Sequence, residues 1–391
     1  MKIPFFKPWI TKDDENAVIR ALRQRWLTNG PNLEKFEKRF SGSLRSKYSL
    51  GVSAATHGLH LCLAGLKISP GDEVILPTFT FSATADAVEY CGGKPVFVDV
   101  SDDSFNILPT KVKQKINKKT KAIIAVHYGG QSCDMNELMK ISKKANIPII
   151  EDCAHALGSL YNSKKCGTIG SLGCFSFYPT KIITTGEGGM VTTNNKEIYN
   201  SLLKFRTHGI HKNANFFVNK DMAFDNNKNV NVWYYEMSKL GLNYRITDIQ
   251  SVLGESQLRK IDKFIDMRRK IAKIYNIGFA KNDLITTPLE SSNVMHAYHL
   301  YTILIDFEKL NKNRNQVMQE LRAKNIGTQV LYIPVHLQPY YSKKYGFKKG
   351  DFPAAEKYYQ SCLSIPIFPH LKEYEVNYVI NKINLIISKR K

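Results

Sequence analysis

The chain has 391 residues, of which 43% are hydrophobic and 23% are charged, as is ordinary for a soluble globular protein. No apolar run approaches the ~20 residues of a membrane span, and the first eight residues do not resemble a signal peptide. The seven cysteines are scattered without a Cys-x-x-Cys pair, which favours free thiols in a reducing cytoplasm over disulfides or a zinc site. We therefore expect a cytoplasmic protein with no metal centre and no membrane partner.

The net charge of +22 is the one unusual value of the composition. A charge of this size would suit a nucleic-acid-binding protein. The basic residues, however, are spread along the chain among Asn and Ile, and no arginine-rich arm is present. We interpret the charge as a compositional bias, with a smaller share that attracts anionic substrates, and we expect no nucleic-acid partner. Charge alone leaves a basic nucleic-acid-binding protein as an alternative.

The first half of the chain predicts an α/β fold. Residues 1–40 predict an N-terminal arm and a helix that pack with a second domain. Apolar strands without strict alternation, separated by helices, indicate a mostly parallel sheet that is covered on both faces. Ligand sites in such sheets form at the carboxyl ends of the strands. The expected strands are 73–76, 95–98, 122–127, 148–152, 174–177 and 190–193, and the expected helices are 56–66, 82–91 and 135–145.

The second half of the chain predicts a smaller α+β domain. A segment rich in Asn, Lys and Asp, residues 213–231, predicts a loop that leaves the core. A long helical region is expected over 247–280. The elements expected after it are strands at 299–306 and 327–333 and helices at 313–324 and 373–387. The expected organisation is an arm and helix (1–40), a large domain (41–250), and a connecting helix with a small domain (251–391).

The stretch around Lys181 carries the most chemical information. An apolar run stops at Pro179, and Lys181 follows on a turn rich in Thr and Gly. A partly dehydrated lysine can have a lowered pKa and attack a carbonyl as an amine. Upstream, a short apolar strand ends at Asp152. A lysine for a Schiff base and an acid for a pyridinium nitrogen are what pyridoxal phosphate needs from a protein. Lys181 alone would be an ordinary surface lysine, but together with Asp152 and Ser176 it favours a cofactor site.

Two further segments fit a cofactor of this kind. Small residues lead into a helix for which Thr56 is the expected N-cap, so the amides of Ala55 and Thr56 would bind a phosphate. Phe81 follows a strand and would stack on a flat ring. Considered singly, these residues would be an ordinary helix cap and a core phenylalanine.

Two polar segments complete the candidate set. His155 lies one helical turn beyond Asp152 and would bond the 3′ oxygen of the cofactor, although a lone histidine is more often structural. Asn243 and Arg245 precede a helix that Thr247 or Asp248 would cap. Considered alone, this segment would be an ordinary loop followed by a helix cap.

The segments 150–156, 175–181, 185–189 and 243–250 resemble the DegT/DnrJ/EryC/StrS-type sugar-nucleotide aminotransferases. The resemblance implies an aspartate-aminotransferase-like fold (fold type I), with a mostly parallel central sheet and a smaller α+β C-terminal domain. It also implies a homodimer with shared active sites. The implied cofactor is pyridoxal 5′-phosphate, with pyridoxamine 5′-phosphate as the intermediate form.

The resemblance also assigns roles to the candidate residues. The catalytic residues would be Lys181, which binds the cofactor and moves protons, Asp152, which protonates the pyridine nitrogen, and His155, which stands where many relatives have Gln. Ala55 replaces the glycine of the relatives' Ser-Gly-Thr, a departure that affects the turn geometry. The remaining cofactor contacts would be stacking by Phe81 and phosphate binding by Ala55, Thr56, Ser176 and the partner subunit's Asn243.

Within the family, the segments 26–31, 233–236, 332–341 and 350–356 resemble members that aminate C4 of a UDP-linked 4-keto sugar in pseudaminic acid biosynthesis. The implied substrates are L-glutamate, which becomes 2-oxoglutarate, and UDP-2-acetamido-2,6-dideoxy-β-L-arabino-hex-4-ulose. His336 is equally open to a structural role, and the segment 208–236 is a further candidate. The expected substrate contacts are Phe6, Trp26, Leu27, Thr28, Asn29, Arg245, Tyr332 and His336.

Other functions stay open on the sequence. A relative of this kind would act at C4 or C3 of another GDP-, dTDP- or UDP-linked keto-sugar. Some family members are dehydratases with histidine in place of the cofactor lysine, and Lys181 argues against that reading. A non-catalytic protein with a degenerate cofactor fold would not be expected to keep Asp152, Ser176 and Lys181 together.

Overall fold

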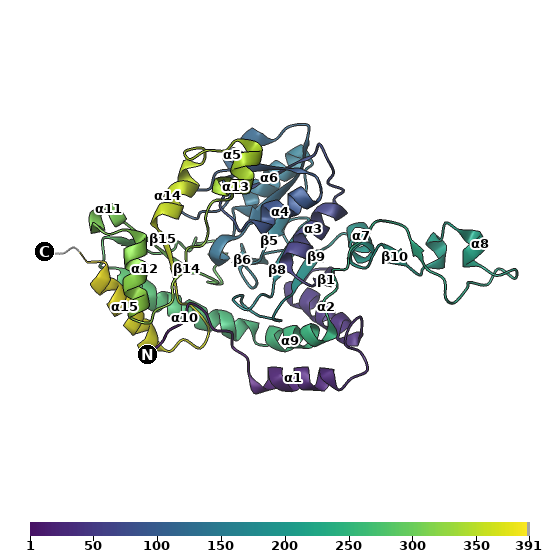
Figure 1. Cartoon of the computed structure of the whole chain (residues 1–391), viewed down its shortest axis with the longest axis horizontal. Helices are drawn as coiled ribbons and strands as arrows, with labels where there is room; N and C mark the ends of the chain where they lie inside the picture. The colour runs from purple at the N-terminus through teal and green to yellow at the C-terminus, as the bar shows by residue number, and fades with distance from the viewer. Residues whose placement is uncertain (389–391) are drawn as a thin grey trace.

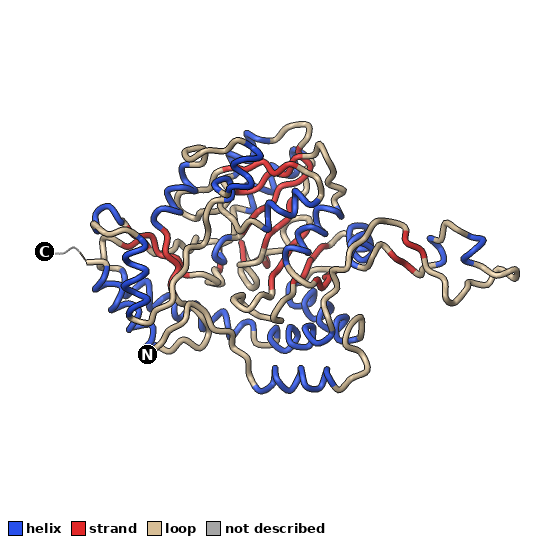
Figure 2. The backbone as a smooth tube through the Cα atoms, in the orientation of Figure 1, coloured by secondary structure: helices blue, strands red, loops and turns tan. Residues whose placement is uncertain are grey.

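A computed structural model describes residues 1–388 (Figures 1 and 2). Its centre is a seven-stranded sheet in the order β1-β9-β8-β5-β4-β2-β3. Only β9 runs antiparallel to its neighbours, so the prediction of a mostly parallel sheet is confirmed. The strands are β1 (Tyr48–Val52), β2 (Glu73–Pro77), β3 (Lys94–Val98), β4 (Thr120–Val126), β5 (Ile149–Asp152), β8 (Leu172–Ser176) and β9 (Gly189–Thr193).

Helices cover both faces of this sheet, which explains why its strands lack a polar face. In β2, Val74 and Leu76 join a core cluster with α3 and α4, whereas Ile75 joins a second cluster with α5 and α6. Successive residues of a strand thus enter opposite cores. The helices of the large domain are α3 (Ala55–Gly65), α4 (Ala83–Tyr90), α5 (Pro109–Lys115), α6 (Met135–Ala145) and α7 (Lys196–Arg206).

The small domain is built around a three-stranded antiparallel sheet in the order β12-β14-β15. The predicted long helical region consists of two helices, α9 (Asp248–Leu258) and α10 (Ile261–Phe279), and α10 packs in the core of the small domain. The other elements of this domain are β12 (Ile285–Thr286), β14 (Tyr301–Ile305), α11 (Phe307–Leu310), α12 (Arg314–Ala323), β15 (Cys362–Ile365) and α15 (Glu373–Ile386).

The strand predictions differ from the structure in two ways. Strands β1, β12 and β15, which belong to the two main sheets, were not among the expected strands. The strand expected at 327–333 is wrong, because this segment makes only a single bridge, Gln329 to Ser364, to the sheet. Beyond that bridge, Leu331 and Tyr332 turn away from the sheet edge and pack against the core of the large domain. Side-chain contacts with the large domain therefore hold this segment, in place of further backbone hydrogen bonds to β15.

The first forty residues contain two helices where one was expected, α1 (Lys12–Leu22) and α2 (Pro31–Leu44, which runs beyond residue 40). Helix α1 lies along α9 (Figure 1), where the buried carboxylate of Asp14 accepts bonds from Ser256, Gln257 and Lys260. Ile3 joins the core of the small domain, whereas α2 packs its phenylalanines beneath the large sheet.

Residues 207–242 form a projecting arm that extends away from the body of the molecule (Figures 1 and 2). This is the excursion expected from the composition of residues 213–231, although it is ordered by β10 (Ile210–His211), β11 (Glu236–Met237) and α8 (Lys220–Ala223). Its own core contains only Phe217, Ala223 and Tyr234 as buried residues. The exposed large apolar side chains of the arm are Phe216, Val218, Met222, Val230, Val232, Trp233, Tyr235, Met237 and Leu240.

Short elements connect these parts. Among the described residues, no helix has both the length and the apolar character that crossing a membrane requires. The short elements are η1 (Tyr128–Gly130), β6 (Leu160–Tyr161), β7 (Lys164–Lys165), η2 (Ala214–Phe216), β13 (Val294–Met295), η3 (Val335–Leu337), α13 (Pro339–Tyr345) and α14 (Pro353–Ser361).

Candidate active site

A cavity of about 620 Å³ opens at the carboxyl ends of β5 and β8 and is closed on its other side by the small domain. Asp152 ends β5, Ser176 ends β8, and Lys181 lies on the turn that follows. Parallel strands bring their carboxyl ends to one sheet edge, which is why residues distant in sequence meet here. The cavity brings together nine predicted residues, namely Phe6, Ala55, Thr56, Phe81, Asp152, His155, Ser176, Lys181 and Tyr332.

Lys181 is held by a tight turn. Its backbone N–H donates to the carbonyl of Tyr178, while Thr184 and Thr185 bond back to Phe177. Burial lowers the pKa of Lys181 to about 8, and the negative charge of Asp152 partly opposes this shift. A substantial fraction of the amine is therefore neutral near physiological pH, the form that acts as a nucleophile or base.

Asp152 is buried and fixed from both sides. Its Oδ2 accepts a hydrogen bond from the hydroxyl of Thr84 at 2.9 Å, and its Oδ1 accepts one from the amide of Ala154 at 3.1 Å. Burial raises the pKa of this carboxyl, whereas the two hydrogen bonds and the charge of Lys181 oppose the rise. Such a carboxylate is preorganised to bond a protonated ring nitrogen. The sequence reasoning missed Thr84, because only the tertiary fold brings α4 beside β5.

His155 joins the two domains. Its Nδ1 accepts a hydrogen bond from the amide of Gly129 at 3.2 Å, and its Nε2 lies 3.0 Å from the hydroxyl of Tyr332 in the small domain. Burial lowers the pKa of His155 well below its ordinary value, with a smaller contribution from the charge of Lys181. The ring is therefore neutral. Because Nδ1 is an acceptor, the proton lies on Nε2, which donates it to the hydroxyl oxygen of Tyr332 at the cavity wall.

The start of α3 supplies a site for an anion. The N-cap is Ala54, which makes no side-chain capping bond, so the prediction of Thr56 as N-cap is wrong by two residues. Because Ala54 has no capping group, the first amides of the helix stay open to a phosphate. A Cβ on Gly189 would lie 2.8 Å from the amide nitrogen of Ala55, so glycine there permits the close approach of β9.

Phe81 is 57% exposed and borders the cavity, with its ring centroid 5.5 Å from that of Tyr332. The alternative of a core phenylalanine is therefore wrong. An exposed ring beside Asp152 and Lys181 leaves room for a flat heterocycle. Together with the open amides of α3, these residues fit the phosphate, the ring and the aldehyde of pyridoxal phosphate.

Besides His336, six predicted residues lie outside the cavity lining of the same chain. Trp26, Leu27, Thr28 and Asn29 form the connection between α1 and α2, where Thr28 bridges to Thr247, the N-cap of α9. Asn243 bridges to Thr207 at the base of the projecting arm. The cavity lining does not include these residues or Arg245.

The predicted sugar contact by His336 is wrong. The side chain is fully buried, with Nδ1 2.7 Å from the hydroxyl of Thr78 and Nε2 3.1 Å from the carboxylate of Glu356. Both ring nitrogens are occupied by these contacts. The histidine therefore ties the loop after β2 to α14, the structural role that the sequence had left open.

Sequence reasoning also missed cavity residues from both domains, including Tyr128, His299 and Gln329. Tyr128 follows β4 at the edge of the large sheet and His299 lies just before β14, and no local pattern separates them from core residues. His299 and Gln329 reach the cavity wall only because the small domain packs over the sheet edge.

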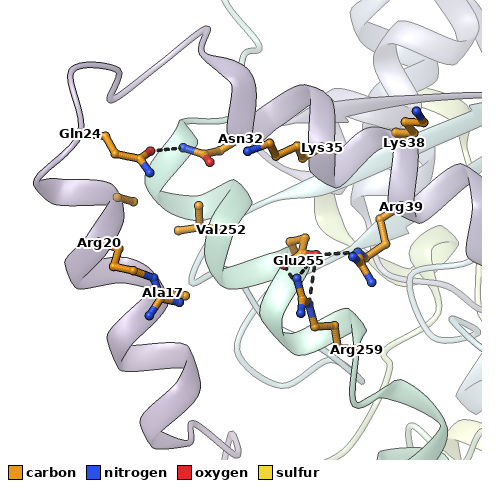
Figure 3. A pocket seen from close by; sticks show the side chains of 11 residues that line it. Ala17, Arg20, Gln24, Asn32, Lys35, Lys38, Arg39, Val252, Glu255 and Arg259 are labelled. Carbon is orange, nitrogen blue, oxygen red and sulfur yellow. Dashed lines mark hydrogen bonds and ion pairs between the residues drawn. The ribbon is translucent and has the colours of Figure 1, made fainter.

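A groove between α1, α2 and α9 gathers part of the positive charge (Figure 3). Its one carboxylate, Glu255, pairs with Arg39 at 2.5 Å and with Arg259 at 2.9 Å. Arg20, Lys35 and Lys38 line the same groove and make no ion pair within residues 1–388. The groove has no enclosed lysine–carboxylate pair such as Lys181 and Asp152, so the chemistry is located in the cavity between the domains.

Comparison with known proteins agrees with this geometry. The model of the DegT/DnrJ/EryC1/StrS aminotransferase family matches residues 8–384. An uncharacterised protein of Methanocaldococcus jannaschii is 42% identical over 100% of this chain and 98% of its own length. The GDP-perosamine synthase of Escherichia coli O157:H7 is 36% identical over 99% of both chains.

Solved structures agree over the same span. PseC of Helicobacter pylori, an aminotransferase of pseudaminic acid biosynthesis, superposes with a TM-score of 0.89 at 29% identity and 99% coverage of both chains. The sugar aminotransferase Spr1654 of Streptococcus pneumoniae, in its form with pyridoxal phosphate, superposes with a TM-score of 0.89 at 29% identity, covering 99% of this chain and 98% of its own. The fold is that of fold type I aminotransferases. The chain therefore belongs to the DegT/DnrJ/EryC1/StrS family of sugar aminotransferases and is a pyridoxal-phosphate-dependent transaminase.

Proposed function

We propose that this transaminase transfers the amino group of L-glutamate to C4 of a UDP-linked 4-keto-6-deoxy-N-acetylhexosamine, UDP-2-acetamido-2,6-dideoxy-β-L-arabino-hex-4-ulose. The product would serve pseudaminic acid or a related surface-glycan amino sugar. The single observation that carries the reaction type is the enclosed Lys181, with a pKa of about 8, beside Asp152. The likeness to PseC over 99% of both chains supports the substrate.

Different residues of the cavity have different roles in the proposed reaction. Bound pyridoxal phosphate supplies an electron sink for the carbanion that forms at the substrate carbon. Asp152 would hold a proton at the pyridine nitrogen of that cofactor, and His155 would donate its Nε2–H to the 3′ oxygen in place of the Tyr332 hydroxyl. The amine of Lys181 removes the proton from Cα of L-glutamate and, in the second half-reaction, delivers a proton to C4 of the sugar.

Other residues hold the cofactor in place. Phe81 covers one face of the ring. The amides of Ala55 and Thr56 and the hydroxyls of Thr56 and Ser176 bind the phosphate at the start of α3. Phe6 and Tyr332, which border the cavity, would contact the sugar.

We further propose a homodimer with shared active sites. The projecting arm exposes a row of apolar side chains and has almost no core of its own, which a monomer rarely tolerates. The arm points away from its own body (Figure 1), so it would instead cover a second copy. In that arrangement, the partner subunit's Asn243 reaches the phosphate, and the segments 26–29 and 208–236, with Arg245, contact the sugar nucleotide of the partner.

A GDP-linked 4-keto sugar is the second candidate substrate. The 36% identity to a GDP-perosamine synthase over 99% of both chains favours it. Both candidates share C4 amination and differ in the nucleotide and in the substituent at C2.

The absorption spectrum of the purified holoenzyme separates these possibilities. L-Glutamate should bleach the cofactor band, and the UDP-linked keto sugar should restore it. If only a GDP-linked 4-keto sugar restores the band, the second candidate replaces the first. If L-glutamate fails to bleach a band that another amino acid bleaches, the donor assignment is wrong. A Lys181→Ala variant, which cannot anchor the cofactor, is the control.

A further inference from the structure

His299 is a buried histidine in the cavity wall that no role described so far uses. It comes from the segment just before β14 and borders the cavity together with Lys181 and His155. Only 5% of the residue is exposed. Its Nδ1 is completely enclosed and has no hydrogen-bond partner among the described residues.

The second ring nitrogen of His299 is therefore the one directed to the cavity. Nε2 makes no hydrogen bond to residues 1–388, yet it is not among the completely enclosed unpartnered atoms. Since the cavity is the opening that His299 borders, Nε2 is accessible from there. Nε2 therefore has an open hydrogen-bonding position, which a ligand oxygen in the cavity would fill.

The charges around His299 favour an anionic ligand. Arg268 is buried, and its NH1 group donates to three carbonyls, those of Tyr298, His299 and Ile367. No carboxylate pairs with this guanidinium in the described chain, and its Nε has no partner. The charge of Lys181 also acts on His299, whereas the carboxylate of Asp152 accepts hydrogen bonds from Thr84 and Ala154. A carboxylate at His299 would balance the uncompensated guanidinium.

We propose that His299 is a substrate-binding residue whose Nε2–H donates a hydrogen bond to a carboxylate oxygen of the amino donor. The inference rests on the proposed transamination from an amino acid and specifies where the donor is held. Arg268 acts as a positioning residue, because its bond to the carbonyl of His299 fixes the backbone that carries the ring.

A neutral imidazole suits a site that takes two substrates in turn. Burial and the neighbouring His155 lower the pKa of His299 well below its ordinary value, so its N–H carries no full charge. A neutral donor can bond a carboxylate in the first half-reaction without trapping an anion when the keto sugar must enter in the second. An arginine in the same place would hold a carboxylate more tightly and would resist replacement by a sugar.

The alternative is that His299 only packs against His155, since their ring centroids lie 4.4 Å apart. Two variants distinguish a ligand-binding role of His299 from a packing role. His299→Phe keeps a ring of similar shape but has no N–H. His299→Gln keeps a neutral donor near the position of Nε2 but loses the ring. His370→Phe is the matched control, because His370 also has an enclosed, unpartnered Nδ1 but does not border the cavity.

The decisive measurement is the affinity of the holoenzyme for glutarate, a dicarboxylate without an amino group, determined by calorimetry. His299→Phe should raise the Kd about tenfold or more, which corresponds to one lost hydrogen bond to a charged group. His299→Gln should recover part of that loss, and His370→Phe should leave the Kd unchanged. Thermal unfolding and the cofactor spectrum verify that each variant is folded and loaded.

Rates of the two half-reactions complete the test. His299→Phe should slow bleaching by L-glutamate at least tenfold and affect restoration by the keto sugar far less. Equal glutarate affinity in wild type and His299→Phe overturns the proposal, as does a variant impaired only with the sugar. If L-glutamate does not bleach the wild-type enzyme, the proposed function is refuted instead. The Kd values for glutarate then still show whether His299 binds a carboxylate.

Discussion

Lys181 and Asp152 face one cavity, and the charge of each opposes the effect of burial on the pKa of the other. Burial favours a neutral amine and a neutral carboxyl, whereas their mutual attraction favours the charged forms. The balance leaves the pKa of Lys181 at about 8, below the 10.5 of a free lysine.

This relationship predicts a pH dependence. Only the neutral amine combines with an aldehyde, so the rate at which the apoenzyme binds pyridoxal phosphate should rise with pH, with a midpoint near 8. In Asp152→Asn the attraction that favours the charged lysine is lost, and the midpoint should move to lower pH. Stopped-flow absorbance across pH 6–10 measures both values. A wild-type midpoint near 10 would show that Lys181 is not dehydrated.

Replacement of Lys181 should abolish catalysis. In Lys181→Ala both the covalent anchor and the proton carrier are lost, so turnover should fall by more than about 1000-fold. The absorbance of the covalently bound cofactor should disappear as well. Lys181→Arg, which keeps a positive charge but cannot form the bond, should be equally inactive. Near-normal turnover in either variant would refute the assignment.

Phe81 should contribute to the affinity for the cofactor. Removing the exposed ring in Phe81→Ala should raise the Kd for pyridoxal phosphate roughly fivefold to tenfold, because one aromatic contact contributes about 1 kcal/mol. Phe81→Trp should retain the affinity. Tyr90→Ala, at the exposed last residue of α4 and outside the cavity lining, is the control. Fluorescence titration of the apoenzyme measures the Kd, and equal values for Phe81→Ala and Tyr90→Ala would remove Phe81 from the site.

The projecting arm should be required for dimer formation. Val232 is 94% exposed and Leu240 is 84% exposed, so a charge at either position costs the monomer little. In the proposed dimer, Val232→Asp together with Leu240→Asp should bury two unpaired charges and give monomers. Leu385→Asp, at a 67% exposed residue of the small domain, is the control. Sedimentation velocity gives the mass, and a double variant that stays dimeric would contradict this role.

Glu151 should stabilise the fold. Its buried carboxylate accepts bonds from the amides of Gly167, Ile169 and Gly170 and lies 3.0 Å from Nε2 of His127. Glu151→Gln turns an N–H₂ group toward these donors and should reduce the free energy of unfolding by about 2–4 kcal/mol. The exposed Glu308→Gln should change it by less than about 0.5 kcal/mol. Urea unfolding of the two variants provides the comparison.

The same cluster raises the question of a metal. The potential ligand atoms of His127, Glu151 and Cys153 lie within 4.8 Å of one another. Their hydrogen bonds already explain the arrangement, since Nδ1 of His127 accepts from the amide of Cys133 and Nε2 faces Glu151. A chelator should therefore leave the Tm unchanged, and a fall of several degrees would indicate a bound ion.

Local sequence patterns predicted the strands and helices that are determined by a few neighbouring residues. Short apolar runs ending in Asp152 or followed by Lys181 predict strands and a site at their carboxyl ends, because both faces of a parallel sheet are buried. The helix after residue 55 was predicted correctly, but its cap was not. Thr56 is of a residue type preferred at N-caps, so the cap was predicted two residues too late. The actual N-cap, Ala54, has no capping side chain that would mark it in the sequence.

The sequence by itself determined the fold class, the cofactor and the two central residues, because strand periodicity and the lysine and aspartate motifs act over short distances. The tertiary structure decided which distant residues share the cavity. It enclosed His336 between Thr78 and Glu356, brought Thr84 to Asp152, and placed His299 beside His155. Those outcomes depend on how the small domain packs over the edge of the sheet, and such packing between residues far apart in the chain leaves no periodic trace in the sequence.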